Sequence, residues 1–192
     1  MKVLVAAMLV ATALAAGSDD EVVQRVHARV EGYDVMAESC RDVFAGIAEP
    51  GYAAFNFRYL ITGKPRAGKY FGRVVFSLGD VAITMPRSIA WKNMTSSDRE
   101  RANALRLAIY HHEAGHVRIA EAVRDALNAA SALAAPDYFA FGAAADAAGR
   151  DGFERFRREE REYDALTEHG RKQHLAPGEL AGPDSSLICP EH

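Results

Sequence analysis

Cysteine is almost absent from this chain, which has only two, Cys40 and Cys189, among its 192 residues. Two cysteines so far apart in sequence do not make a zinc site by themselves. A concentrated basic segment is also lacking, since 23 Lys and Arg are offset by 26 Asp and Glu for a net charge of −3. This balance argues against a nucleic-acid binder, which usually shows a basic face.

Long apolar runs are missing apart from Val3–Leu14, which is too short to span a bilayer comfortably. The run follows Lys2, and Ala13-Leu14-Ala15 fits the small-x-small rule of signal peptidase. We therefore predict a signal peptide over residues 1–16, cleaved after Ala15 or by Gly17, and export to the periplasm or the medium. The alternative is an uncleaved anchor. No cysteine follows the run, so this is not a lipoprotein signal.

The mature chain, residues 17–192, has the length of one domain, and 49% of the sequence is hydrophobic, ample for a core. Export to an oxidising compartment favours a disulfide between Cys40 and Cys189, which would clip the C-terminal tail onto the N-terminal half. The alternative is two separate thiols, with Cys40 buried on a helix. After signal cleavage we expect no membrane span.

Apolar periodicity predicts a strand around Val26–Val30, a helix over residues 36–47 and a strand over residues 53–61. Two further apolar runs, residues 73–78 and 81–85, are joined by Gly79-Asp80, which indicates a hairpin, and Pro86 closes the second run.

Residues 96–135 predict a long helix with N-cap candidates at Ser96, Ser97 and Asp98, and Pro136 as its stop. Its apolar stripe recurs at steps of three and four and contains two histidines: Leu105, Ile109, His112, His116, Ile119, Val123 and Leu127. A second helical region covers residues 138–170, with a break near Gly149–Gly152. These elements predict an α+β domain in which a small, mostly antiparallel sheet packs with a long helix and a C-terminal helix.

The sequence His112-Glu113-Ala114-Gly115-His116 lies on this stripe. Residues four apart in a helix share one side, so both imidazoles can bind one zinc ion. Glu113 lies about 100° around the helix, close enough to take a proton from a zinc-bound water. The alternative is that both histidines are ordinary core residues. His111, also about 100° from His112, is expected near the site or at the surface.

A catalytic zinc normally has three protein ligands, and the fourth position holds water. Glu121 is five residues from His116, which turns it away from the metal-facing stripe. The second helical region offers Glu160, Asp164 and His169. A returning helix could bring residues near 169 beside the two histidines. The residues alone leave these three candidates open.

Three segments resemble the bacterial family of secreted zinc-dependent proteases known as domain of unknown function 922. They are "AITMPRSIAW" from Ala82 to Trp91, "HHEAGHVRIAEA", and a "YDxxTxHGxxQ" signature matched by Tyr163, Asp164, Thr167, His169, Gly170 and Gln173. The resemblance implies a zincin-like metalloprotease fold and one zinc ion. It also implies His112, His116 and His169 as ligands, and Glu113 as general base.

The same resemblance makes Tyr163 a candidate for stabilising the oxyanion. Asp164 is either a residue that orients a ligand histidine or the third ligand itself, and Glu160 is the other alternative. The expected function is an exported zinc-dependent metallopeptidase that uses a zinc-bound water, with a polypeptide substrate extended along Val81–Met85. The alternatives are a non-catalytic envelope protein stabilised by zinc or by a disulfide, and an amidase acting on a cell-wall component.

Overall fold

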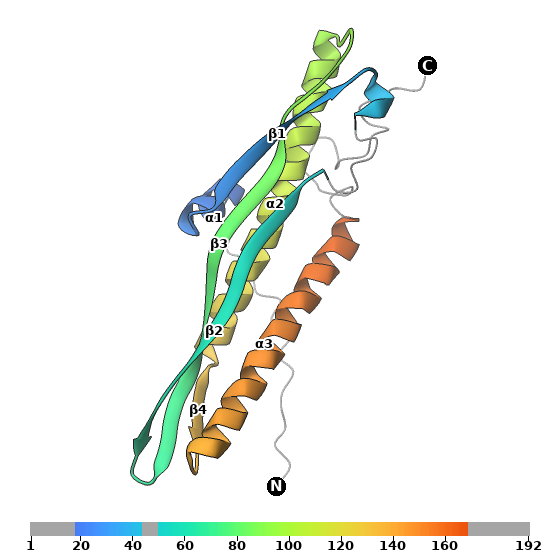
Figure 1. Cartoon of the computed structure of the whole chain (residues 1–192). Helices are drawn as coiled ribbons and strands as arrows, with labels where there is room; N and C mark the ends of the chain where they lie inside the picture. Colours follow the sequence, from blue (N-terminus) through green and yellow to red (C-terminus); the bar gives the residue numbers. More distant parts are fainter. Residues whose placement is uncertain (1–17, 44–49, 169–192) are drawn as a thin grey trace.

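The computed structural model describes residues 18–43 and 50–168. Two long helices accompany a small sheet, and the whole is elongated (Figure 1). The elements in chain order are α1 (Asp19–Arg25), β1 (Arg29–Ala37), the 3-10 turn η1 (Cys40–Asp42), β2 (Tyr52–Arg66), β3 (Lys69–Trp91), α2 (Ser96–Ala129), β4 (Ala132–Ala135) and α3 (Tyr138–Thr167). The predicted α+β class is confirmed.

The sheet is organised around β3, which has neighbours along both edges. Strand β2 runs antiparallel along one edge, from Tyr52↔Thr84 to Arg66↔Lys69. The other edge is shared by β1, which is parallel to the second half of β3, and β4, which is antiparallel to its first residues. The result is a mixed four-stranded sheet with one parallel and two antiparallel pairings.

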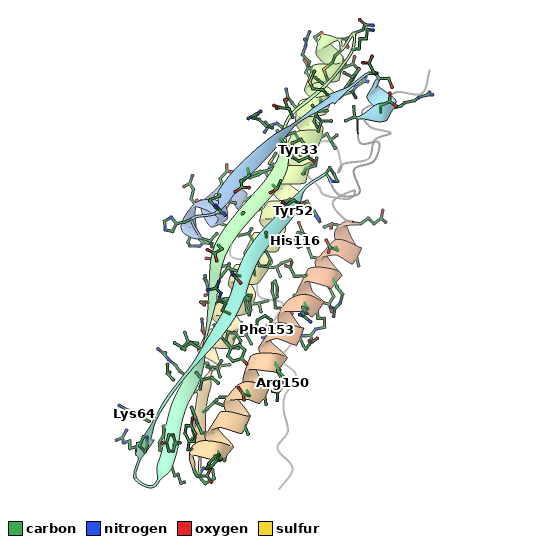
Figure 2. All side chains as sticks on the ribbon, in the orientation of Figure 1. Tyr33, Tyr52, Lys64, His116, Arg150 and Phe153 are labelled. Atoms are coloured by element: carbon green, nitrogen blue, oxygen red, sulfur yellow. The ribbon has the colours of Figure 1, made fainter. Side chains whose placement is uncertain are left out.

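Helices α2 and α3 cover one face of this sheet (Figure 1). The predicted period-two pattern of β2 is confirmed, since alternate side chains such as Phe55 and Phe57 point toward the helices. The Phe57 ring stacks on the Phe156 ring of α3, with centroids 4.7 Å apart. Helix α2 contributes Ala120 and Val123 to this core, and Ile109 and Val117 to a second buried cluster with β1 and β3. On the opposite face, the even-numbered side chains of β2 from Tyr52 to Arg66 are exposed, and Figure 2 shows the side chains on both sides of the sheet.

The predicted hairpin at Gly79-Asp80 is wrong, because β3 continues through this point to Trp91. Asp80 adopts a left-handed φ of 52° and adds one residue to β3 where the register with β2 shifts, which is a β-bulge. The actual hairpin is Ala67-Gly68, where two positive φ values, 48° and 72°, match the twist of the strands. Pro86 also lies inside β3, next to a second register shift that accommodates its missing N–H.

Other predicted boundaries also differ from the structure. Residues 36 and 37 belong to β1, and Met36 is 77% exposed, so the helical spacing that starts there is not a buried stripe. The strand predicted around Val26–Val30 starts later than expected: residues 19–25 form α1, and β1 begins at Arg29. The predicted break in α3 is absent. Gly149 and Gly152 are buried in this helix and allow close packing, because a Cβ would lie 2.4 Å from the Tyr59 ring at Gly149 and 2.6 Å from the Phe76 ring at Gly152.

Within residues 18–43 and 50–168, no helix combines the length and apolar character needed to cross a membrane. Cys40 is a disulfide-bonded cysteine. The predicted signal peptide, the last residues of the predicted helix over 36–47, and Cys189 lie outside the described residues. The pairing of Cys40 with Cys189 therefore stays a prediction.

The side chain of Asn128 on α2 takes the place of a partner strand beside Phe76. Its Oδ1 accepts from the Phe76 N–H at 2.8 Å, and its Nδ2 donates to the Phe76 carbonyl at 2.9 Å. Asn128→Ala leaves both backbone groups unpaired, so we expect the free energy of unfolding to fall by about 2–4 kcal/mol in a denaturant titration. Asn103→Ala, exposed on the same helix, is the control and should change it by less than about 0.5 kcal/mol. Equal effects would contradict this role.

Candidate metal centre

The middle of α2 brings the HExxH residues into the interior. His112, Glu113 and His116 are all buried. The helix begins upstream at a capping box, in which Thr95 Oγ1 accepts from the Asp98 N–H and Asp98 accepts from the Thr95 N–H. The N-cap is thus one residue before the predicted candidates.

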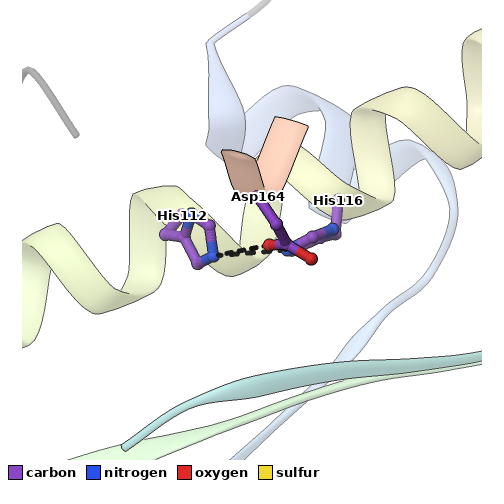
Figure 3. A group of neighbouring side chains, drawn as sticks. All are labelled: His112, His116 and Asp164. Carbon is purple, nitrogen blue, oxygen red and sulfur yellow. Dashed lines mark hydrogen bonds and ion pairs between the residues drawn. The ribbon is translucent and has the colours of Figure 1, made fainter. Parts of the chain in front are cut away.

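Asp164 of α3 lies against both histidines (Figure 3). Its Oδ1 is 3.1 Å from His116 Nε2 and 3.5 Å from His112 Nε2. The two Nε2 atoms are 3.3 Å apart. One ligand atom from each residue therefore falls within a single small volume that could hold a metal ion.

These separations fit a tetrahedral zinc site. Two atoms each about 2.0–2.2 Å from zinc at the tetrahedral angle lie about 3.3–3.6 Å apart. The observed 3.3 and 3.5 Å fall within this range, and 3.1 Å lies about 0.2 Å below it. Two nitrogens and one carboxylate oxygen are also a donor set that zinc accepts. The residues present therefore fit a zinc ion.

The opposite nitrogen of His116 is held by Glu160. His116 Nδ1 lies 3.0 Å from Glu160 Oε2, so it donates its proton to that carboxylate and its Nε2 points at the site. Burial disfavours the imidazolium, but the Glu160 hydrogen bond and the charges of surrounding carboxylates outweigh it and raise the pKa of His116. A carboxylate behind a ligand histidine fixes the tautomer and raises ligand basicity.

The opposite nitrogen of His112 is held by Thr167. The Thr167 hydroxyl donates to the Tyr163 carbonyl at 2.8 Å, which orients its lone pairs toward His112 Nδ1 at 3.4 Å. His112 then carries its proton on Nδ1 and directs Nε2 toward Asp164. Both imidazoles are thus held in the tautomer that a metal needs.

All of these supporting groups come from one stripe of α3. Glu160, Tyr163, Asp164 and Thr167 are spaced at i, i+3, i+4 and i+7, so they share one helix face. The Tyr163 ring stacks on the His112 ring, with centroids 5.1 Å apart, and its hydroxyl donates to the His112 carbonyl. The predicted role of Tyr163 at an oxyanion stays a prediction.

Gly115 permits this close approach of the two helices. A Cβ at this position would lie 2.0 Å from Tyr163 Oη and 2.5 Å from Tyr163 Cζ. Any side chain here would push α3 away from α2. Gly115 therefore sets the helix separation at which Asp164 reaches both histidines.

The predicted return of the chain is confirmed for Asp164. From His116 the rest of α2 rises about 20 Å and β4 adds about 13 Å, so more than 20 residues of α3 are needed to come back level with it. Helix α3 ends at Thr167, and Glu168 adopts the left-handed conformation with φ 50°. His169, the ligand implied by the family resemblance, lies outside the described residues, so its role stays a prediction.

Two neighbours of the motif face away from the site, as expected from their helical offsets. Glu121 binds Arg25 through two hydrogen bonds, at 2.7 and 2.8 Å, and its pKa is lowered first of all by this bonding. His111 Nδ1 lies 2.7 Å from Asp19 Oδ2. Both residues therefore attach α1 to α2.

The sequence assigned no role to two residues of the site: Thr167, which was named only as part of the family signature, and Gly51. Thr167 was visible as the fourth member of the α3 stripe, although nothing in the sequence indicated its contact with His112. Gly51, just before β2, is buried against α2: a Cβ there would lie 2.5 Å from Ile109 Cγ2 and 2.9 Å from Glu113 Oε1. No local signal distinguishes this glycine from a turn glycine.

The predicted substrate position along Val81–Met85 is wrong. Residues 82–84 of β3 already pair with β1 on one side and β2 on the other. An additional strand has no unpaired backbone to join there. Strand β2 is an edge strand, as β1 is on the other side of β3, and its only strand partner among the described residues is β3.

The fold and the site define a two-layer α+β protein with a candidate metal centre between its two long helices. Residues 22–170 match the family described as "Bacterial protein of unknown function (DUF922)", and the chain belongs to this family. No curated protein and no solved structure matches the chain. Because the family description assigns no activity, any activity has to be argued from the site.

Glu160→Gln tests the support behind His116. The amide can still accept the hydrogen bond but loses the charge, so we expect zinc affinity to fall at least about 10-fold, as for other residues that support a ligand histidine. Competition with a chelating dye measures this affinity. The neighbouring Glu159 forms an ion pair with Arg155 at 3.7 Å and supplies the control Glu159→Gln with the same charge change. Equal affinity in the two variants would contradict the role of Glu160.

Proposed function

We propose that this protein is an exported zinc-dependent metallopeptidase. The observation that carries the proposal is the convergence of His112 Nε2, His116 Nε2 and Asp164 Oδ1 at zinc-ligand spacing, with both imidazoles held from behind. Three protein ligands leave a fourth position for water, which is the arrangement of catalytic zinc sites. Export rests on the N-terminal sequence alone.

Zinc bound at such a site lowers the pKa of a coordinated water to about 7 and polarises a carbonyl. The chain's own contribution is the carboxylate of Glu113, which lies one residue after a ligand histidine on α2. It is buried beside Gly51, and its charge acts on His116. Glu113 is therefore placed to accept a proton at its carboxylate and to return it to the leaving amine.

The outer edge of β2 is the place for the substrate. This edge strand starts at Tyr52, directly after the glycine that packs against Glu113. A polypeptide that adds to β2 as a further strand would have its backbone fixed by main-chain hydrogen bonds near the site. We propose this position in place of Val81–Met85, where the sequence led us to expect the substrate.

The non-catalytic alternative differs in coordination number. If His169 also binds the metal together with Asp164, four protein ligands close the site, as in structural zinc sites. The metal would then stabilise the pairing of α2 and α3 and activate no water. The number of protein ligands therefore separates an enzyme from a zinc-stabilised envelope protein. The cell-wall amidase alternative would use the same residues on a different amide.

Glu113→Gln tests the enzymatic proposal. The substitution removes the proton acceptor and keeps the shape, so we expect hydrolysis of a broad peptide library to fall by about 100- to 10,000-fold while zinc stoichiometry is unchanged. Glu100→Gln, at an exposed position of the same helix, is the control and should retain full activity. A zinc-loaded wild type that cleaves nothing in the library would contradict the proposal.

Asp164→Ala and His169→Ala test the third ligand. We expect Asp164→Ala to lower zinc affinity by more than about 100-fold, beyond the range of residues that only support a ligand. Metal content after dialysis against a chelator measures the loss. A comparable loss in His169→Ala as well would indicate a closed, non-catalytic site. A loss in His169→Ala alone would contradict Asp164 and favour the ligand set that the family resemblance implies.

A further inference from the structure

The β2–β3 hairpin carries an unusual concentration of positive charge. Residues 50–79 contain no Asp or Glu and five basic residues: Arg58, Lys64, Arg66, Lys69 and Arg73. The rest of the chain has 18 Lys and Arg against 26 Asp and Glu, so it carries a net charge of −8, and the whole chain −3. The charge is therefore segregated in this one segment.

The strand register places all five on the outer face of the sheet, away from the helices. Arg66 pairs with Lys69, Lys64 with Phe71, Thr62 with Arg73 and Arg58 with Ser77. Paired residues share a face, and successive residues alternate between faces. Because the intervening residues Tyr59 and Ile61 pack toward the helices, these partners all point outward.

Four of these charges have no ion-pair partner within residues 18–43 and 50–168. Arg58 forms an ion pair with Asp80 at 3.3 Å. Lys64, Arg66, Lys69 and Arg73 are exposed and form no ion pair with any other described residue. The far end of the hairpin, where Figure 2 labels Lys64, is thus open to an external anion.

Exposed apolar side chains accompany these charges. Leu60 is 65% exposed and Phe71 41% exposed on the same outer face. The start of α3, at the same end of the molecule (Figure 1), adds Tyr138 at 62% and Phe139 at 84%. The Tyr138 ring rests against Tyr70 of β3, with centroids 5.5 Å apart, which fixes it beside the hairpin.

We propose that this end of the molecule docks peripherally on an anionic lipid surface. We call it the hairpin end and define it by Leu60, Lys64, Arg66, Lys69, Phe71, Arg73, Tyr138 and Phe139. Basic side chains near a membrane are attracted to anionic headgroups, and aromatic side chains insert at the headgroup boundary. A nucleic acid would satisfy the charges but would offer no apolar layer for Leu60 and Phe139. A lipid surface satisfies both sets.

Docking at this end keeps the candidate metal centre away from the lipid surface. Strand β2 begins beside Glu113 and runs 15 residues to the hairpin, a span of about 50 Å. The hairpin end therefore lies far from His112 and His116. The docking proposal does not depend on the proposed peptidase activity, and lipid binding can be measured without it.

Co-sedimentation of the full mature protein with vesicles tests the proposal. We expect binding to vesicles of phosphatidylcholine and phosphatidylglycerol at 3:1 and at least about 10-fold weaker binding to phosphatidylcholine alone, with the difference decreasing as salt rises. Neutralising three tip charges with Lys64→Gln/Arg66→Gln/Lys69→Gln should lower the partition coefficient about 100-fold.

The matched control is Arg150→Gln/Arg157→Gln/Arg158→Gln. This variant has the same net charge as the triple variant of the hairpin tip, but its substitutions lie at exposed positions of α3. It should bind anionic vesicles within about threefold of the wild type. Phe139→Ala should weaken binding without changing its salt dependence, since it removes only apolar insertion. Equal loss in both triple variants, equal binding to both vesicle types, or tighter binding of a DNA duplex than of anionic vesicles would overturn the lipid assignment.

Discussion

The convergence of three ligand atoms between α2 and α3 is the constraint on which the rest of the structure depends. His116 Nδ1 donates to Glu160 and His112 Nδ1 faces Thr167, so both Nε2 lone pairs point toward the Asp164 carboxylate. Lone pairs this close repel one another in a buried environment unless a cation lies between them. A proton at His116, whose pKa is raised, can provide partial relief. A metal ion satisfies all three atoms at once, which is the physical basis for the proposed site.

Small residues and strand lengths make this convergence geometrically feasible. Gly115 lets Tyr163 lie directly on α2, and Gly149 lets α3 lie on the ring of Tyr59. Strand β4 carries the chain beyond the end of α2 before α3 turns back, so the last turns of α3 come level with His112 and His116. On the other side of the motif, Gly51 lets the start of β2 pack against Glu113. The proposed proton acceptor and the start of the edge strand β2 are therefore brought together at Gly51.

Much of the site could be predicted from the sequence because it depends on local spacing. The i, i+4 histidines, the buried stripe of α2 and the second helix with Glu160 and Asp164 follow from helical periodicity. The strand boundaries of the sheet were harder to predict. Asp80 and Pro86 are residues that typically form a turn and end a strand, yet both lie within β3. Tertiary pairing on both edges of β3 overrides those local signals. The partner of each imidazole could not be deduced, since it depends on how two helices fifty residues apart align along their axes.

The most direct test of the account is the metal coordination of the purified protein. Zinc should be retained at one ion per chain after export and purification without chelators. X-ray absorption of that sample should show only nitrogen and oxygen neighbours, at about 2.0–2.2 Å, with the signature of two imidazoles. A protein that retains no zinc, or a spectrum with sulfur neighbours at about 2.3 Å, would contradict the assignment of His112, His116 and Asp164 as the metal site.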